Sequence, residues 1–283
     1  MAKALITGTS SGIGAATVDY LVQQGFEVIA AVRKTADAER LATQYGAAVQ
    51  PVVLDMNDTT SIEGAIGRLA PSLEQEGLAA LVNNAGVSYP SVLEYIDIEA
   101  TKAMFATNVF GPMALTAACI PLLKDRGQGA GRIVNVSSGA GQLAIPLGGT
   151  YSASKFALEG YSDALRVELR QQGIKVSVIE PGFIESAIHD KTHAERDALI
   201  ASLSDEGQQL YGAALQKNIE NFERQSQKAT PAIEVAKAVH HAITANRPRT
   251  RYGVGPDAKM LHVLKPVLFD RLRDTIVGKM VGL

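Results

Sequence analysis

A glycine-rich turn near the start of the chain limits the possible folds more than any other feature. Ala4-Leu5-Ile6 is a short apolar run typical of a strand, glycines follow at positions 8, 12 and 14, and a helical apolar pattern covers residues 15–24. Such glycines permit a tight turn, close approach of backbone N–H groups to a pyrophosphate, and close packing of helix on sheet. The order predicts a dinucleotide-binding unit, although the spacing G-x-x-x-G-x-G is not the commoner one and a purely structural turn is an alternative.

The rest of the chain continues this alternation of strands and helices. Strand-type and helix-type segments alternate from residue 3 to residue 180 of the 283-residue chain. We therefore expect one α/β domain over residues 1–283, with a Rossmann-type doubly wound parallel sheet, helices on both faces, and a C-terminal helical extension. A net charge of -2 and a pI near 6.2 give no reason to expect a nucleic-acid partner.

Tyr151 and Lys155 place a phenol and an ammonium on one face of a predicted helix. A free tyrosine has a pKa of about 10, and a lysine four residues later stabilises the phenolate, so we expect a lowered pKa for Tyr151. By itself this spacing is also a frequent accident on solvated helices. Ser138 strengthens the interpretation because it follows the strand at residues 132–136, at the edge where parallel sheets bind ligands. Together these residues predict acid–base chemistry of the kind that nicotinamide-dependent hydride transfer needs.

Six motifs in register resemble those of the short-chain dehydrogenase/reductases, and they cover roughly residues 3–186. The motifs are Thr7-Gly8-x-x-x-Gly12-Ile13-Gly14, Asn83-Asn84-Ala85-Gly86, Asn108, Ser138, Tyr151-x-x-x-Lys155 and Pro181-Gly182. The stretch at residues 151–160 is similar to the branch that contains hydroxysteroid and retinol dehydrogenases. The resemblance implies a fold and an activity that agree with the residue chemistry above.

Four catalytic roles follow from the resemblance. It implies that Tyr151 is the catalytic acid or base, that Ser138 holds the substrate oxygen, and that Asn108 anchors a water that relays protons. Lys155 would lower the pKa of the tyrosine and bind the nicotinamide ribose. In the reducing direction, Ser138 and Tyr151 would stabilise the charge that develops on a carbonyl oxygen.

The expected cofactor site extends over several loops. Asp55 would lie beside the adenine, or serve only as a turn or capping carboxylate before a helix at Ser61. Asn84 could also tie neighbouring strands together. The backbone after Pro181-Gly182 would contact the nicotinamide amide, and Ser186 stands where the family usually has threonine. The full predicted set is Gly8, Ser10, Ser11, Gly12, Ile13, Gly14, Arg33, Asp55, Asn84, Ala85, Gly86, Tyr151, Lys155, Pro181, Gly182, Ile184 and Ser186.

The end of the second predicted strand favours NADP(H) over NAD(H). The strand at residues 26–32 ends in Val32, where NAD enzymes of the family carry Asp, and Arg33-Lys34 follow. An arginine can pair bidentately with the 2′-phosphate of NADP, and Ser11 is an additional donor. The alternative is that Arg33 and Lys34 only begin a solvated loop.

Two later segments are expected to serve the substrate or a partner. Residues 187–228 stand where the family builds a substrate lid, although a surface helical pair is an alternative. Residues 255–283 form an amphipathic C-terminal extension that could roof the pocket, pack on a second subunit or lie on a membrane surface. The family resemblance makes a homodimer or homotetramer the expected assembly, through helices that begin near Thr101 and Tyr151.

Other features exclude some classes of site. The single cysteine, Cys119, lies in an apolar segment and is expected to be a buried free thiol. His189 and His193 are four residues apart but have no third ligand nearby, so we expect no metal site. No signal peptide and no uninterrupted apolar run long enough to span a bilayer are expected, and the predicted location is cytoplasmic.

The predicted function is NADP(H)-dependent interconversion of a carbonyl and an alcohol on a fairly large apolar substrate of steroid, retinoid or long-chain carbonyl type. The apolar character is inferred from the residues near the motifs: Tyr89, Pro90, Leu93, Leu143, Ala144, Ile145, Pro146, Leu147 and Phe183. One alternative is reduction of an acyl-carrier-bound ketone, with Lys191, Arg196 and residues 247–251 as a basic docking surface. Another is a non-catalytic NADP-binding sensor or scaffold.

Overall fold

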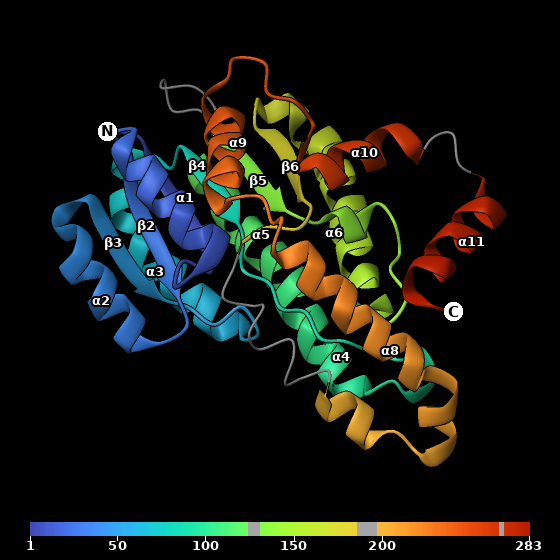
Figure 1. Ribbon diagram of the computed structural model, residues 1–283. Coiled ribbons are helices and arrows are strands. Elements are labelled where there is room, and N and C mark those ends of the chain that lie inside the picture. The colour runs from blue at the N-terminus through green and yellow to red at the C-terminus, as the bar shows by residue number, and fades with distance from the viewer. Residues whose placement is uncertain (124–130, 186–196, 266–268) are drawn as a thin grey trace.

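Seven parallel strands form the centre of the structure, a computed structural model that describes residues 1–123, 131–185, 197–265 and 269–283 (Figure 1). The strand order is β3-β2-β1-β4-β5-β6-β7. Successive strands are therefore added toward one edge of the sheet up to β3 and toward the other edge from β4 onward. The crevice at the carboxyl ends of β1 and β4, where this direction changes, is where such sheets bind ligands. The bounds are β1 (Lys3–Thr7), β2 (Glu27–Val32), β3 (Val49–Val53), β4 (Ala80–Asn83), β5 (Arg132–Val136), β6 (Lys175–Pro181) and β7 (Arg251–Val254).

Helices cover both faces of the sheet because successive strand residues point to opposite sides. Ala4 and Ile6 of β1 belong to one buried cluster with α1 (Gly12–Gln23), α2 (Thr35–Tyr45) and α9 (Ala232–Thr244). Leu5 belongs to the other cluster, with α3 (Thr59–Glu76), α5 (Gly111–Leu123) and α6 (Gly149–Glu168). The single-domain doubly wound α/β prediction is confirmed.

The boundaries differ from the sequence prediction in places. The strand β3 ends at Val53, so Asp55 lies in the loop beyond it. The helix expected to begin at Ser61 begins at Thr59, because the Asp58 side chain accepts a hydrogen bond from the backbone N–H of Thr60 and caps it.

One helix bears on the expectation about membrane-spanning segments. The continuous helix Ile98–Leu123, formed by α4 (Ile98–Phe105), a π-helical turn (Ala106–Phe110) and α5, is long and apolar enough to cross a membrane by length and composition, with a mean hydropathy of 1.5. The expectation that the chain has no membrane-spanning segment therefore stays a prediction. A core helix of a globular protein meets the same criteria, and α5 packs against α3. The prediction rested on uninterrupted apolar runs, whereas this helix includes polar residues.

The single cysteine is a buried thiol. Cys119 is fully buried and has no disulfide partner, as predicted, and burial raises the pKa of its thiol to about 12. Within the described ranges, no group of three or more His, Cys, Asp and Glu side chains could hold a metal ion. His189 and His193 lie outside those ranges.

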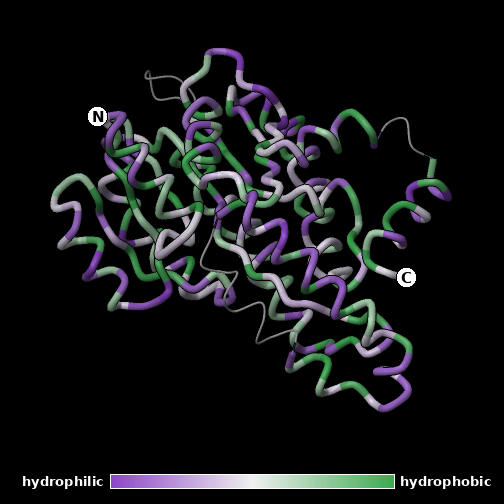
Figure 2. The backbone as a smooth tube through the Cα atoms, in the orientation of Figure 1, coloured by the Kyte–Doolittle hydropathy of each residue, from purple (hydrophilic) through white to green (hydrophobic). Residues whose placement is uncertain are grey.

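The C-terminal extension consists of two helices outside the sheet, α10 (Pro256–Leu264) and α11 (Asp270–Val281) (Figure 1). Hydrophobic and hydrophilic stretches alternate along α11 (Figure 2). Its exposed apolar side chains recur at helical spacing, at Leu272, Ile276 and Met280. Because α10 packs against β7, whereas α11 contacts α8 (Asp205–Ser226), the two helices serve different parts of the structure.

Replacement of Gly14 by alanine tests the turn that positions the site. A Cβ at Gly14 would overlap Gly8 O and lie 2.6 Å from Asn84 Nδ2. We expect Gly14→Ala to lower the free energy of unfolding by about 1–3 kcal/mol, the usual effect of overpacking, as measured by urea denaturation. Gly67→Ala is the control, because a Cβ at this exposed position in α3 meets nothing within 4 Å, and alanine should raise stability by up to about 1 kcal/mol. Equal effects of the two substitutions would contradict the prediction.

Candidate active site

Thr7 and Asn84 join the carboxyl ends of β1 and β4. Thr7 Oγ1 accepts hydrogen bonds from the backbone N–H groups of Asn84 (3.0 Å) and Ala85 (2.9 Å). In return, Asn84 Nδ2 donates to Thr7 O (2.9 Å) and Gly8 O (3.2 Å). Asn84 therefore ties neighbouring strands together, as one of its two predicted roles requires, and it brings Ala85 against the glycine turn.

The glycine turn leaves a hollow beside its backbone, which side chains at the glycine positions would fill. Gly8 and Gly12 have φ values of +69° and +56°, in the left-handed region that favours glycine. A Cβ at Gly8 would lie 2.8 Å from Ala85 Cα. Since α1 begins at Gly12, its free backbone N–H groups lie at this hollow, an arrangement that suits a pyrophosphate. Ser10 and Ser11 are exposed beside the turn, while Ile13 packs against the core.

Asn108 lies in the π-helical turn between α4 and α5. Its Oδ1 accepts from the backbone N–H of Val87 (2.8 Å), and its Nδ2 donates to Val87 O (2.9 Å) and to Ser154 Oγ (3.0 Å). Single π-helical turns occur frequently at functional sites. The turn thus places a buried amide between the loop after β4 and the helix α6 that carries Tyr151 and Lys155.

Lys155 is the centre of the predicted catalytic group. Its side chain is buried, and Nζ donates to Val136 O (3.0 Å), the last residue of β5 before Ser137-Ser138. The same Nζ lies 5.7 Å from the centroid of the Tyr151 ring. A Cβ at Gly86 would lie 3.4 Å from Asn108 Oδ1 and 3.5 Å from Lys155 Nζ. Asn108, Lys155 and Gly86, predicted from three separate motifs, therefore surround one point.

Burial controls the protonation of the two central groups. Burial raises the pKa of the Tyr151 phenol, while a hydrogen bond with Ser138 lowers it. Burial also lowers the pKa of Lys155 to about 8, against the opposing effect of the Glu159 charge. The expectation that Lys155 lowers the pKa of Tyr151 is therefore wrong for the protein alone, because desolvation of the phenolate is the larger effect.

A buried group of charges lies one helical turn beyond Lys155. Glu159 of α6 and Glu180 of β6 are almost fully buried, and Arg251 of β7 approaches Glu159 Oε2 at 3.0 Å and Glu180 Oε1 at 3.3 Å. Arg251 also binds both carboxylate oxygens of Asp163 at 2.8 Å. Burial, and then the charge of Glu180, raise the pKa of Glu159 to about 7. Sequence reasoning missed this group, although Glu159 follows Lys155 at helical spacing.

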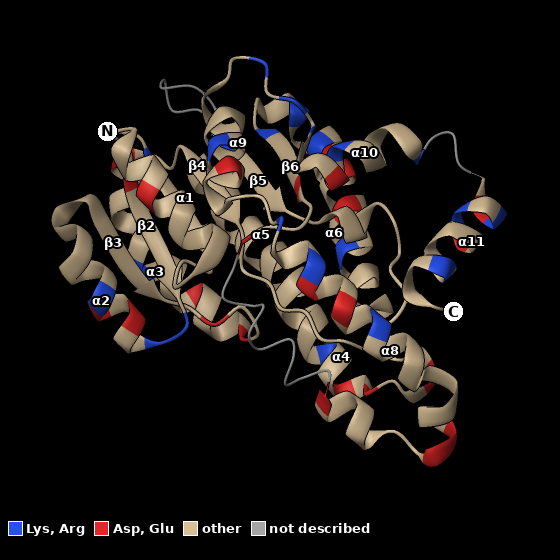
Figure 3. Cartoon of the chain, in the orientation of Figure 1, with Lys and Arg blue, Asp and Glu red and all other residues tan. Residues whose placement is uncertain are grey.

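The adenine end of the predicted cofactor site lies at the loop after β2. A basic stretch joins β2 to α2 (Figure 3). It holds Arg33, whose side chain is exposed. Arg40 of α2 was not predicted, yet its NH2 group donates to Ser10 O in the glycine turn at 3.0 Å. Asp55 Oδ1 accepts from the backbone N–H of Asn57 (2.9 Å), so Asp55 serves as a turn carboxylate, as its alternative reading required.

The turn after β6 holds the predicted nicotinamide contacts Pro181, Gly182 and Ile184. Gly182 N donates to Val254 O (2.8 Å), and Phe183 N donates to Asp257 Oδ2 (2.8 Å). Ile184 forms an isolated bridge with Thr230. Ser186, the last predicted member of the cofactor site, lies outside the described residues.

Part of the predicted lid packs on apolar residues close to the site. The rings of Phe183 and Phe222 of α8 meet edge to face with their centroids 4.8 Å apart. Leu147 is buried in a cluster with Leu203 and Leu215, and it has a φ of 62°, a strained value for a branched residue. The stretch of the lid at residues 187–196, with His189, Lys191, His193 and Arg196, lies outside the described residues.

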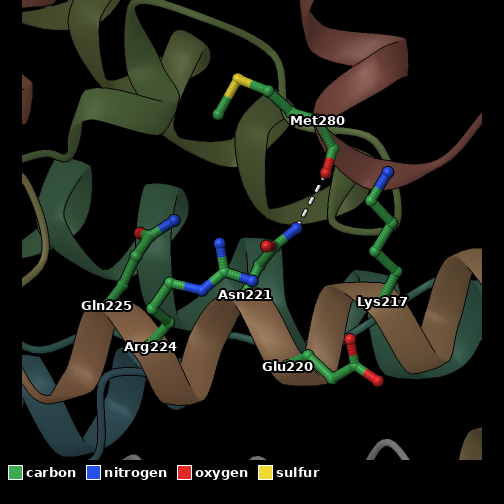
Figure 4. Close-up of a pocket in the computed structure, with 6 residues that line it drawn as sticks. All are labelled: Lys217, Glu220, Asn221, Arg224, Gln225 and Met280. Carbon is green, nitrogen blue, oxygen red and sulfur yellow. Dashed lines mark hydrogen bonds between the residues drawn. The ribbon is translucent and has the colours of Figure 1, made fainter.

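A hollow of about 520 Å³ lies between α8 and α11 (Figure 4). The side chains around it are mainly polar: Lys217, Glu220, Asn221, Arg224, Gln225 and Met280. Asn221 Nδ2 donates to Met280 O (2.8 Å) and Lys217 Nζ donates to Lys279 O (2.9 Å), so both side chains satisfy carbonyl groups at the end of α11. The hollow contains none of the predicted catalytic residues and therefore has a different location from the candidate active site.

Known proteins resemble this chain over most of its length. A family model described as short chain dehydrogenase matches residues 2–197. The chain is 36% identical over 263 residues to short-chain dehydrogenase/reductase family 9C member 7 of Bos taurus, with 91% of this chain and 83% of the relative covered. It is 33% identical to retinol dehydrogenase 5 of Homo sapiens (96% and 86% covered). It is 32% identical to the NADPH-dependent 3-dehydrocapnine reductase of Ornithobacterium rhinotracheale (99% and 97% covered).

Solved structures share the fold. A short-chain dehydrogenase from Streptomyces avermitilis superposes with a TM-score of 0.77 at 27% identity, covering 98% of this chain and 96% of that chain. A serine dehydrogenase complexed with NADP+ gives 0.74 at 25% identity (90% and 94% covered). A short-chain dehydrogenase/reductase from Burkholderia phymatum in complex with NAD gives 0.76 at 24% identity (98% and 94% covered). Together with the family model and the site geometry, these similarities show that the chain is an oxidoreductase of the short-chain dehydrogenase/reductase family, in its retinol and hydroxysteroid dehydrogenase-like branch.

Proposed function

We propose that this chain is an NADP(H)-dependent oxidoreductase that interconverts a carbonyl and an alcohol on a fairly large apolar substrate of steroid, retinoid or long-chain carbonyl type. The observation that carries the proposal is the convergence of Asn108, Lys155 and Gly86 on one point beside Tyr151. This point lies at the same end of the sheet as the glycine hollow. Acid–base groups and a pyrophosphate site at one sheet edge are what nicotinamide chemistry requires of the protein.

The residues divide the chemistry between them. When bound, the nicotinamide would supply a hydride to a carbonyl carbon or accept one from an alcohol. Ser138 and Tyr151 would hold the substrate oxygen and stabilise its developing charge, and Tyr151 would donate the proton during reduction. The Lys155 ammonium, held by Val136 O, would hold the ribose.

The cationic side chains near the glycine turn support NADP(H) as the cofactor. Arg33 lies in the exposed stretch after β2, and Arg40 reaches Ser10 O from α2. A guanidinium beside Ser10 and a second one in the loop that precedes α2 would suit a 2′-phosphate, with which arginine pairs bidentately. Among the related proteins, one is named for NADPH and solved neighbours contain either NADP+ or NAD, so the preference of this chain rests on its own residues.

The apolar wall supports a large apolar substrate. Phe183, Phe222 and the cluster around Leu147 lie close to the predicted catalytic loops, and retinol dehydrogenase is among the related names. Arg251, part of the basic surface that a carrier-bound substrate would need, is instead engaged by Glu159, Glu180 and Asp163. This engagement favours a free apolar substrate over the carrier-bound alternative.

A homodimer or homotetramer in the cytoplasm belongs to the same proposal. Phe110, the last residue of the π-helical turn before α5, and Phe156 of α6 are 60% and 40% exposed, which supports a partner packed on these two helices. The single free cysteine supports a reducing compartment.

Turnover of NADPH tests the proposed function directly. We expect the purified protein to oxidise NADPH in the presence of apolar aldehydes or ketones. The loss of absorbance at the nicotinamide band measures this reaction. Tyr151→Phe should lower kcat by about 10²-fold or more, because it removes a general acid, and should leave the Kd for NADPH near the wild-type value. Tyr161→Phe, on the same helix, is the matched control. Wild-type turnover by Tyr151→Phe would contradict the assigned role.

Cofactor preference can be tested at the two arginines. We expect Arg33→Ala and Arg40→Ala each to weaken NADPH binding by about tenfold or more, because each removes a charge-assisted hydrogen-bonding group. Their affinity for NADH should not change, since NADH lacks the 2′-phosphate. Fluorescence titration provides both constants, with Arg68→Ala of α3 as an exposed control. Equal losses for NADPH and NADH would count against a 2′-phosphate site.

The buried lysine predicts a pH-dependent stability. Since burial lowers the pKa of Lys155 to about 8 in the folded protein, the unfolded chain binds one more proton than the folded one between pH 8 and the unfolded value of about 10.5. The free energy of unfolding of the wild type, relative to Lys155→Met, should therefore rise over that interval, by about 3 kcal/mol at most. Urea unfolding at a series of pH values measures it. Lys102→Met, at an exposed lysine, should give a flat difference, and a flat difference for Lys155→Met would refute the prediction.

A further inference from the structure

The turn that follows β6 is held in place by residues far away in the sequence. Gly182 N donates to Val254 O (2.8 Å), and Phe183 N donates to Asp257 Oδ2 (2.8 Å). On the other side, Thr230 N donates to Phe183 O (2.9 Å). All three partners lie beyond residue 197, where the match to the family model ends. The C-terminal third of the chain therefore determines where this turn lies.

Asp257 fits the turn in shape as well as by its hydrogen bond. A Cβ at Gly182 would overlap both carboxylate oxygens of Asp257. On the opposite side, a Cβ at Gly255, whose φ is +102°, would lie 2.7 Å from Asp257 Oδ1. Two glycines thus leave room for one carboxylate. A hydrogen bond from a backbone N–H to a carboxylate is stronger than one between neutral groups, so this contact is suited to fixing a loop.

The helix α10, which carries Asp257 in its first turn, also contacts the segment after Ser138. A Cβ at Gly139 would lie 3.2 Å from Leu261 Cδ1 of α10. Lys265 Nζ donates to Gln142 Oε1 (2.7 Å), and His262 Nε2 pairs with Glu180 Oε2 at the end of β6. One short helix therefore touches both loops that flank the predicted catalytic group.

We propose that Asp257 is a positioning residue that holds the backbone of residues 182–184 at the nicotinamide end of the site, with α10 as the spacer between this turn and the Ser138 segment. The proposal rests on the proposed function, because it assumes that this turn contacts the nicotinamide. Its physical basis is preorganisation: a loop whose backbone is already fixed loses less entropy when it binds the cofactor.

The test separates the nicotinamide half of the cofactor from the adenosine half. We expect Asp257→Ala to raise the Kd for NADPH about tenfold or more, through loss of a charge-assisted hydrogen bond. Affinity for adenosine 2′,5′-bisphosphate, which lacks the nicotinamide, should stay at the wild-type value. Asp257→Asn, which keeps an acceptor oxygen of the same shape, should restore most of the NADPH affinity. Asp270→Ala, in the first turn of α11, is the matched control.

A double-mutant cycle with Gly182 sharpens the test. Gly182→Ala should weaken NADPH binding in the wild-type background, because its Cβ displaces the carboxylate, and should add little to Asp257→Ala, where the space is free. If Asp257→Ala does not fold, as judged by circular dichroism, Gly182→Ala and Asp257→Asn carry the test with the same two ligands.

Two results would overturn the role of Asp257. One is wild-type NADPH affinity in both Asp257→Ala and Gly182→Ala. The other is an equal loss of affinity for NADPH and for the adenosine fragment, which would indicate general damage to the fold. Wild-type binding and turnover of NADPH, measured in the same series, report on the proposed function itself. A failure of that function is therefore distinguishable from a failure of the positioning role.

Discussion

The hydrogen bond from Lys155 Nζ to Val136 O is the interaction on which the candidate site depends. It joins α6, which carries Tyr151, to the end of β5, which leads into Ser138. Without it, the buried ammonium would lack this carbonyl partner, and the two catalytic segments would keep the hydrogen bond between Tyr151 and Ser138 but lose the bond at Val136. The remaining parts of the site are arranged around this bond: Asn108 through the π-helical turn, and Gly86 at the end of β4. A parallel sheet provides the common edge where all of them meet.

This arrangement has an energetic consequence for the chain. Burial disfavours both the Lys155 ammonium and the Tyr151 phenolate, so each charged form depends on a neighbour. Glu159 supports the lysine charge from one helical turn away, and Arg251 in turn forms ion pairs with the buried Glu159 and Glu180. The site is thus connected electrostatically to β6 and β7, and its stability is expected to vary with pH where a surface site would not. Buried charges that reduce stability are common where function, rather than stability, selects the residues.

Much of the fold was predictable from local patterns, whereas several site contacts were not. Apolar runs, a glycine turn and alternation with helices predict a doubly wound sheet because each signal lies within a few residues. The Tyr151 and Lys155 spacing is likewise local. Arg40 approaches Ser10 only after α2 has packed, and Asp257 reaches Phe183 only when β7 pairs with β6. The raised pKa of Tyr151 arises from burial by distant segments, so a helical-spacing argument alone led to the wrong direction. The π-helical turn at Asn108 carries no spacing signal of its own.

The most direct measurement follows a deuterium label from the cofactor to the product. NADPH that carries deuterium at the transferable C4 position would be incubated with apolar aldehydes and ketones of steroid, retinoid and long-chain type, and the alcohols analysed by mass spectrometry and NMR. Hydride transfer in this site predicts an alcohol with deuterium on its carbinol carbon, with the hydroxyl proton coming from solvent. NADPH that binds tightly but delivers no label to any member of the series would contradict the assignment and favour a cofactor-sensing protein that retains the fold.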